Sequence, residues 1–290
     1  MIFLGTASAA GFPNPFCSCE DCRKARSSQD DREIRARSSF LLDERNLIDF
    51  SADTLYAANR FRKSLENVRN IFLTHCHEDH FDYWNMEFFN MAADSHPPVH
   101  LYLSRKAAEG LQQVIESLRH LPYPRMTHQF LNMEKVFYLH PMDFYQTVEV
   151  DGMQVTPMKG RHEGFFNDEN SANYVLERPE GNLMYACDTG RFFEETYEWL
   201  AGHKLDILVI EGTFGLRETA MDSGHMNFYA VCDTLERLYR MQVLDKKSRV
   251  YVTHLSPKGK MTHMEYEKRL QDRFGPSVFV AYDGLEISAE

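Results

Sequence analysis

The sequence predicts an α/β protein in which two sheets are covered by helices on their outer faces. Short apolar runs of strand length recur in both halves of the 290-residue chain, and amphipathic helical patterns are spread between them. Hydrophobic residues make up 43% and charged residues 26% of the chain, which excludes disorder and coiled coil. No Gly/Ser-rich linker divides the chain, so residues 1–290 are expected to form one domain.

The first half begins with strand patterns. Residues 39–42 and 46–49 flank Asp43-Glu44-Arg45 and predict a hairpin. The elements expected after it are a helix at 52–68, a strand at 68–74, a strand at 99–103 and a helix at 104–119 capped by Ser104. Residues 120–146 are rich in Pro, Tyr, Met and Phe and predict a loop-rich insertion, which could serve as a lid, a dimer contact or plain core.

The second half repeats the alternation of strands and helices. Residues 173–178 and 183–186 flank Pro179-Glu180-Gly181 and predict a second hairpin. The other expected elements are strands at 147–150, 207–210, 249–253 and 278–281 and helices at 227–240 and 262–274. The strands in both halves therefore predict two sheets with helices outside them.

The charge balance and the hydropathy pattern restrict the partners. Acidic residues number 43 against 32 basic ones, giving a net charge of −11, so nucleic-acid binding is not expected. No apolar run reaches the length of a membrane span. The N-terminus lacks a basic segment and is interpreted as a first strand, not a signal peptide. We therefore expect a cytoplasmic protein with reduced cysteines.

A cluster of metal-binding residue types follows the strand predicted at 68–74. The run Thr74-His75-Cys76-His77-Glu78-Asp79-His80 has the pattern His-x-His-x-Asp-His. Imidazole and carboxylate groups are the ligands that Zn, Mn and Fe take in mixed sites. Alternating residues of a tight loop can point at one ion, with Asp79 and His80 directed at a neighbouring position. These ligands can therefore begin a site for two metal ions.

The pattern Thr-His-x-His-x-Asp-His resembles the signature of the metallo-β-lactamase superfamily. The resemblance implies an αββα sandwich with the site at one edge, and a further His, an Asp and a last His that follow at strand ends. His162, Asp188 and His254 stand in that order. The resemblance implies two divalent ions, Zn, Mn or Fe, with Asp188 bridging them and Asp79 also orienting a hydroxide. The implied ligands are His75, His77 and His162 for one ion and Asp79, His80 and His254 for the other.

The N-terminal region contains a second cluster, Cys17-Ser18-Cys19-Glu20-Asp21-Cys22. Three thiolates at this spacing suit a structural zinc, which needs a fourth ligand. Together with the preceding Leu-Gly-Thr-x-Ser-Ala-Ala-Gly segment, the cluster resembles the PhnP-like branch of phosphodiesterases. In that branch the fourth ligand is a His three residues after the last active-site His, a position that Pro257 occupies here. His263 is the nearest substitute; water or an incomplete site are the alternatives.

A further His precedes the helix predicted at 227–240. The resemblance implies that His225 reaches the phosphate of the substrate and acts in proton transfer, whereas helix capping is the alternative. Glu211, at the end of the strand at 207–210, is a candidate partner for the second ring nitrogen of a ligand His.

The expected function is dinuclear-metal hydrolysis of a small, cyclic phosphodiester by metal-activated hydroxide. The expected partner is accordingly a small anionic phosphodiester, without a membrane or nucleic acid, and homodimer formation is left open. The alternatives are another superfamily hydrolase acting on a thioester or lactone, a tRNA 3′-processing nuclease, and a non-enzymatic accessory protein similar to PqqB.

Overall fold

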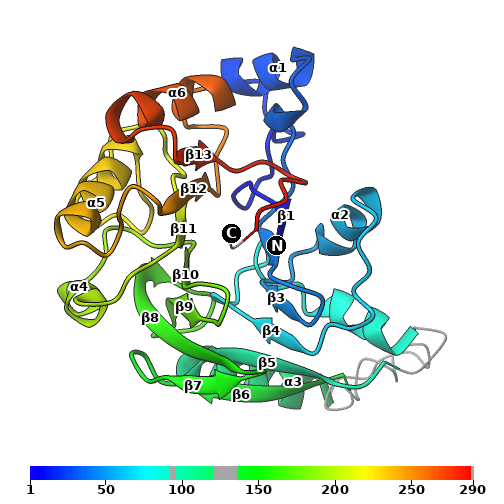
Figure 1. The fold of residues 1–290 in the computed structure, drawn as a ribbon. Helices are drawn as coiled ribbons and strands as arrows, with labels where there is room; N and C mark the ends of the chain where they lie inside the picture. The colour runs from blue at the N-terminus through cyan, green and yellow to red at the C-terminus, as the bar shows by residue number, and fades with distance from the viewer. Residues whose placement is uncertain (92–95, 120–135, 289–290) are drawn as a thin grey trace.

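The computed structural model describes residues 1–91, 96–119 and 136–288. Figure 1 shows two sheets packed against each other. The first sheet has the strand order β1-β2-β3-β4-β5-β6, antiparallel through β3 and parallel from β3 to β6. Its strands are β1 (Ile2–Gly5), β2 (Ser39–Leu41), β3 (Asn46–Ile48), β4 (Asn70–Phe72), β5 (Val99–Ser104) and β6 (Phe137–Met142).

The second sheet has the order β13-β12-β11-β10-β9-β8-β7. Its pairs are antiparallel from β7 to β10 and parallel from β10 to β13. Its strands are β7 (Val148–Val150), β8 (Met153–Glu163), β9 (Asn170–Glu177), β10 (Leu183–Ala186), β11 (Ile207–Glu211), β12 (Arg249–Thr253) and β13 (Val278–Val280). The parallel strands of both sheets end near one edge of the sandwich, which is where the site forms.

Helices cover the outer face of each sheet (Figure 1). α4, α5 and α6 pack on the second sheet, and α2 and α3 pack on the first. Among the described residues the helices are α1 (Glu20–Ser27), α2 (Thr54–Arg60), α3 (Arg105–Arg119), α4 (Glu194–Leu200), α5 (Phe228–Arg240), α6 (His263–Phe274) and the 3-10 helices Asp31–Glu33 and Trp84–Met91. No helix in this part of the chain is both long enough and apolar enough to cross a membrane.

Alternation along the strands produces three apolar layers. In β11, Leu208 and Ile210 face the helices, whereas Ile207 and Val209 belong to the core between the sheets. From the other sheet, Phe72 enters the same central core. Both faces of the second sheet are thus buried, which explains the continuous apolar run in β11. The expected αββα sandwich is confirmed.

The expected loop-rich insertion at 120–146 is wrong in its last part. Residues 137–142 form β6, which pairs in parallel with β5 at the edge of the first sheet. An edge strand tolerates Pro141 because one side of the strand needs no backbone donor. Residues 120–135 of the predicted insertion lie outside the described residues.

Other element boundaries also differ. The helix expected at 52–68 is the shorter α2, and α1, α4 and β8 were not predicted. β8 contains Pro157 and Gly160, residues that argue against a long strand, and its register with β9 shifts between Lys159 and Glu163. The hairpins β2–β3 and β9–β10 and the helix α5 agree with the predictions, and Asn227, expected as the first residue of that helix, is its N-cap.

Candidate metal centre

The structure brings the seven residues proposed for the dinuclear site together at one edge of the sandwich. They come from the loop after β4, the end of β8, and the positions immediately after β10 and β12. The carboxyl ends of neighbouring parallel strands meet at one edge, so side chains that are far apart in sequence converge there. The residues are His75, His77, Asp79, His80, His162, Asp188 and His254.

Three imidazoles form the first group. Nε2 of His75 lies 2.9 Å from Nδ1 of His77, and Nε2 of His162 lies 3.3 Å from the same atom. Oδ2 of Asp188 is 3.4 Å from Nε2 of His75 and 3.7 Å from Nε2 of His162. Ligands about 2.0–2.1 Å from a tetrahedral zinc stand about 3.4 Å apart, so these spacings fit one ion.

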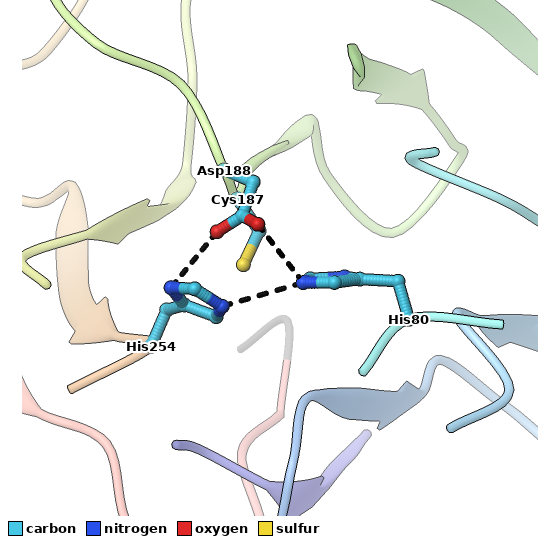
Figure 2. Close-up of side chains that lie close together, drawn as sticks. All are labelled: His80, Cys187, Asp188 and His254. Carbon is cyan, nitrogen blue, oxygen red and sulfur yellow. Dashed lines mark hydrogen bonds and ion pairs between the residues drawn. The ribbon is translucent and has the colours of Figure 1, made fainter. Parts of the chain in front are cut away.

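The second group shares the same carboxylate oxygen. Nε2 of His80 lies 3.1 Å from Oδ2 of Asp188, 3.4 Å from Oδ2 of Asp79 and 3.3 Å from Nε2 of His254. Oδ2 of Asp79 is 3.5 Å from Nε2 of His254. Figure 2 shows Asp188 between His80 and His254. Oδ2 of Asp188 therefore belongs to both groups, as a bridging ligand requires, and both donor sets fit a divalent ion.

Hydrogen bonds at the other ring nitrogens orient the ligands. Nδ1 of His162 lies 3.2 Å from the carbonyl oxygen of Gly224, to which it donates, leaving the Nε2 lone pair for the site. Nδ1 of His80 lies 2.7 Å from Oδ2 of Asp49. Oδ1 of Asp49 accepts from the backbone N–H of Thr74 at 2.8 Å. Asp49 was not predicted, although a carboxylate directly after an apolar strand is a readable signal.

A second buried carboxylate joins two ligand-bearing loops. Oε1 of Glu169 accepts from the backbone N–H of Cys76 at 2.8 Å, and Oε2 accepts from that of Phe166 at 2.9 Å. Cys76 stands between His75 and His77, and Phe166 follows the end of β8 that carries His162. Glu169 thus ties together the loops that form the first group. Nothing in its local sequence indicates this role.

His225 and Glu211 lie beside the bridging carboxylate. Nδ1 of His225 is 3.3 Å from Oε1 of Glu211 and 3.6 Å from Oδ1 of Asp188. Oε2 of Glu211 accepts from Oγ1 of Thr213, whose oxygen is 2.9 Å from Nδ1 of His254. Glu211 therefore supports both His225 and, through Thr213, a ligand of the second group. The helix cap is Asn227, so capping does not explain His225.

The backbone turns sharply at three site residues. Asp49, Asp188 and His254 have φ of 60°, 50° and 60°. Each follows the last residues of a strand, and the left-handed conformation is uncommon for residues other than Gly. The turn directs the side chain into the site at the point where the strand ends.

At Asp188 and His254, neighbouring charges outweigh the effect of burial on the pKa. Burial raises the pKa of Asp188, but the charges of His254 and His80 outweigh it and hold that pKa well below the usual range. Burial lowers the pKa of His254, but the Asp188 carboxylate outweighs it and raises that pKa to about 9. For His75 burial dominates, and its pKa lies well below the usual range. The carboxylates thus favour positive charge at the second group, which a cation would supply in place of protons.

Cys187 lies next to Asp188 within the second group (Figure 2), with its thiol 3.8 Å from Oγ of Ser38. Complete burial raises the pKa of the Cys187 thiol well above its usual value. The imidazoles and carboxylates described above complete both ligand groups without Cys187.

The three N-terminal thiols also gather, but His263 does not join them. The Sγ atoms of Cys17, Cys19 and Cys22 lie within 4.8 Å of one another. Nδ1 of His263 is 2.9 Å from Nη2 of Arg35, which can only donate. The ring proton of His263 is then on Nε2, so neither nitrogen offers a lone pair to a metal. The expectation that His263 completes the cysteine site is wrong.

A cavity of about 500 Å³ opens over the dinuclear site. Its lining includes ligands of both groups and His225. It also includes Cys17 and Cys19 of the N-terminal cluster, together with Lys258. Its volume lies within the range of small-molecule sites. Both metal-binding clusters therefore border one space.

The four-layer fold and the His and Asp side chains gathered at its edge together define a class, the αββα proteins with a candidate divalent-metal site at one edge of the sandwich. The family model described as the β-lactamase superfamily domain matches residues 44–255. The chain belongs to this family, whose members are mostly metal-dependent hydrolases.

Solved structures share the whole fold. A diphosphatase from the PhnP family matches with a TM-score of 0.71 and 20% identity, covering 99% of this chain and 96% of that chain. Zn²⁺-bound PqqB from Methylobacterium extorquens matches with a TM-score of 0.72 and 17% identity, covering 99% of each chain. The short form of human tRNase Z matches with a TM-score of 0.63 and 15% identity, covering 100% and 98%. The comparison with curated protein sequences found no match.

Proposed function

We propose that the protein is a dinuclear-metal phosphodiesterase that cleaves a small, cyclic phosphodiester. The observation that carries the proposal is the position of Asp188, whose Oδ2 is shared by two ligand groups while its Oδ1 lies 3.6 Å from His225. The ligand set would hold two divalent ions, Zn or Mn. When bound, such ions lower the pKa of a water and neutralise charge on phosphoryl oxygens.

The protein's own residues would position and protonate the substrate. Burial lowers the pKa of His225, but the carboxylates of Glu211 and Asp188 outweigh burial and raise it. A protonated His225 directs Nδ1 at Glu211 and keeps a second proton on Nε2. That proton can pass to the oxygen of a departing alkoxide, which is a poor leaving group without protonation. A thioester releases a thiolate that needs no such proton, so His225 favours an oxygen ester.

The cavity and the charge of the protein support a small anionic substrate. Lys258 and His225 line the cavity that opens over the two ligand groups. The net charge of −11 opposes a long phosphate backbone, whose binding depends on many basic contacts. A diphosphatase from the PhnP family shares the fold over 99% of this chain, so the same fold supports hydrolysis at phosphorus in that protein.

A substrate panel tests the proposal. The metal-loaded protein is assayed with bis-(p-nitrophenyl) phosphate, a ribose cyclic phosphodiester, an acyl thioester, a lactone and precursor tRNA, with Asp188→Ala as the control. We expect hydrolysis of the phosphodiesters and its loss in the variant. Turnover confined to the thioester or lactone, cleavage of tRNA alone, or equal activity of the two proteins would overturn the proposal. So would the absence of any turnover, which would instead support an accessory protein.

A further inference from the structure

The N-terminal cysteine cluster is organised as a set of metal ligands. Cys22 is buried in α1, Cys17 is half-buried, and Cys19 is exposed at the start of the helix. The backbone N–H of Cys19 donates to Sγ of Cys17 at 3.4 Å. The backbone N–H of Cys17 donates to the carbonyl oxygen of Asn14 at 3.0 Å, which closes the loop. The three thiols are therefore held in one place by local backbone contacts.

This donor set fills three of the four positions of a tetrahedral zinc ion. Among the described residues, no further Cys, His, Asp or Glu joins the three thiols within 4.8 Å. His263 is engaged with Arg35, and Pro257 has no donor atom in its side chain. The residues fit a metal with three protein ligands and do not fit a closed four-ligand site.

The open side of the cluster faces the cavity over the dinuclear site. Cys17 and Cys19 line that cavity along with His77 and Asp79. Pro257 forms part of the same wall. A molecule that enters the cavity can therefore reach the cysteine cluster, whereas Cys22 closes its inner side.

The charge of the cluster limits what the fourth position accepts. Three thiolates and one divalent cation leave one net negative charge. The nearby guanidinium groups bond to loop carbonyls: Nη1 of Arg26 donates to Asn14 at 3.1 Å, and Arg23 donates to Ser18. These cations offset part of the charge from outside the cluster. At the fourth position a neutral donor is favoured over a further anion, because an anion would add to the net negative charge of the three thiolates and the metal.

We propose that Cys17, Cys19 and Cys22 bind a thiophilic divalent metal whose fourth position is exchangeable, faces the dinuclear cavity and accepts a neutral nitrogen donor. Zinc and cobalt are suitable ions because both accept thiolate and imidazole ligands. This proposal does not depend on the phosphodiesterase function, since it concerns metal binding alone.

Cobalt substitution tests the proposal without an activity assay. The protein is loaded with Co²⁺, and its thiolate-to-cobalt charge-transfer absorption is followed during titration with imidazole. We expect the absorption in the wild-type protein, and a saturable shift as imidazole binds. The variant Cys17→Ser/Cys19→Ser retains Cys76, Cys187 and Cys232 and should lack the absorption. Absorption that persists in this variant would assign it to other thiols and overturn the proposal.

Two further results are decisive. Wild-type protein without charge-transfer absorption, or with absorption that imidazole leaves unchanged, contradicts an open trithiolate site. The variant Pro257→His adds an imidazole to the wall of the cavity that Cys17 and Cys19 also line, and should abolish the response to added imidazole. A response as large as that of the wild type would contradict the stated direction of the open position.

Discussion

The two metal-binding clusters border one cavity but are built in different ways. The dinuclear site takes its ligands from strand ends of both sheets, and buried groups such as Asp49 and Glu169 orient its ligands or ligand-bearing loops. The cysteine cluster takes its ligands from one loop and the first turn of α1, and Cys19 is exposed. When ligands stand at the edges of sheets, the core holds them in position before a metal binds. When they stand on a short segment, their arrangement depends on the bound metal. The predictions below test this difference.

The largest effect is expected for Asp188→Ala. The variant removes the one oxygen shared by both ligand groups, so both metal positions lose a ligand at once. We expect the metal content of the dinuclear site to fall, with phosphodiester hydrolysis reduced by at least about 10²–10³-fold. Elemental analysis and turnover of bis-(p-nitrophenyl) phosphate measure the two effects. Full metal content with normal turnover would show that the carboxylate is not a bridge.

Asp49→Asn tests whether the core orients the second ligand group. The variant removes the charge that holds Nδ1 of His80 while leaving all seven ligands in place. Loss of such a partner weakens metal binding by about 10–100-fold. Metal titration by competition with a chromophoric chelator measures the change. The matched control is Asp143→Asn, whose exposed carboxylate pairs with Arg105 at the surface and should leave affinity unchanged.

Metal removal should separate the two clusters. We expect the fully loaded protein to hold three ions, and a chelator to remove the ion of the cysteine cluster first, because Cys19 is exposed and the cluster lacks a fourth protein ligand. Metal content during timed dialysis against the chelator measures the order. Cys17→Ser/Cys19→Ser should begin with two ions and lack the fast phase. A single rate of loss for all ions would remove the contrast between the clusters.

The smallest effect concerns a buried carboxylate near the N-terminal segment. Burial raises the pKa of Asp283 to about 6, against the opposing hydrogen bonds from Ala36 and Thr6. A raised folded-state pKa means that the contribution of Asp283 to stability is full below about pH 4 and is lost as pH rises through about 6. The free energy of unfolding of the wild type, relative to Asp283→Asn, should therefore fall between these pH values by about 2–3 kcal/mol at most.

Chemical denaturation at several pH values measures this difference, and any metal contribution shared by the two proteins cancels. Glu286→Gln is the control, because this exposed carboxylate pairs with Lys63 at the surface. A free energy of unfolding of the wild type that rises with pH relative to that of Asp283→Asn would contradict a raised pKa.

The parts predicted well have local causes. The run from His75 to His80 places four ligands within six residues, so the pattern is readable without the fold. The hairpins and α5 follow from alternation and capping, which act over a few residues. β6 and β8 were missed because Pro141, Pro157 and Gly160 oppose strands locally, while pairing with neighbouring strands outweighs that preference.

The error at His263 has a different origin. Its separation from His254 along the chain says nothing of where its ring lies. The capping box at Thr262 begins α6 at His263, and packing of that helix turns the ring toward Arg35. A residue whose role depends on the direction of its side chain cannot be assigned from spacing alone.

The sequence by itself determined the α/β class, the order of the strand-end ligands and the three clustered thiols, because these depend on residue type and short-range periodicity. The family resemblance implied Asp188 as a bridge, and the tertiary structure placed its Oδ2 in both ligand groups. Only the tertiary structure showed that Asp49 and Glu169 orient ligands or their loops. Only the structure, likewise, placed the cysteine cluster on the cavity of the dinuclear site. These relations depend on which strands lie side by side and where each one ends. They arise from long-range packing between segments that are far apart in the chain.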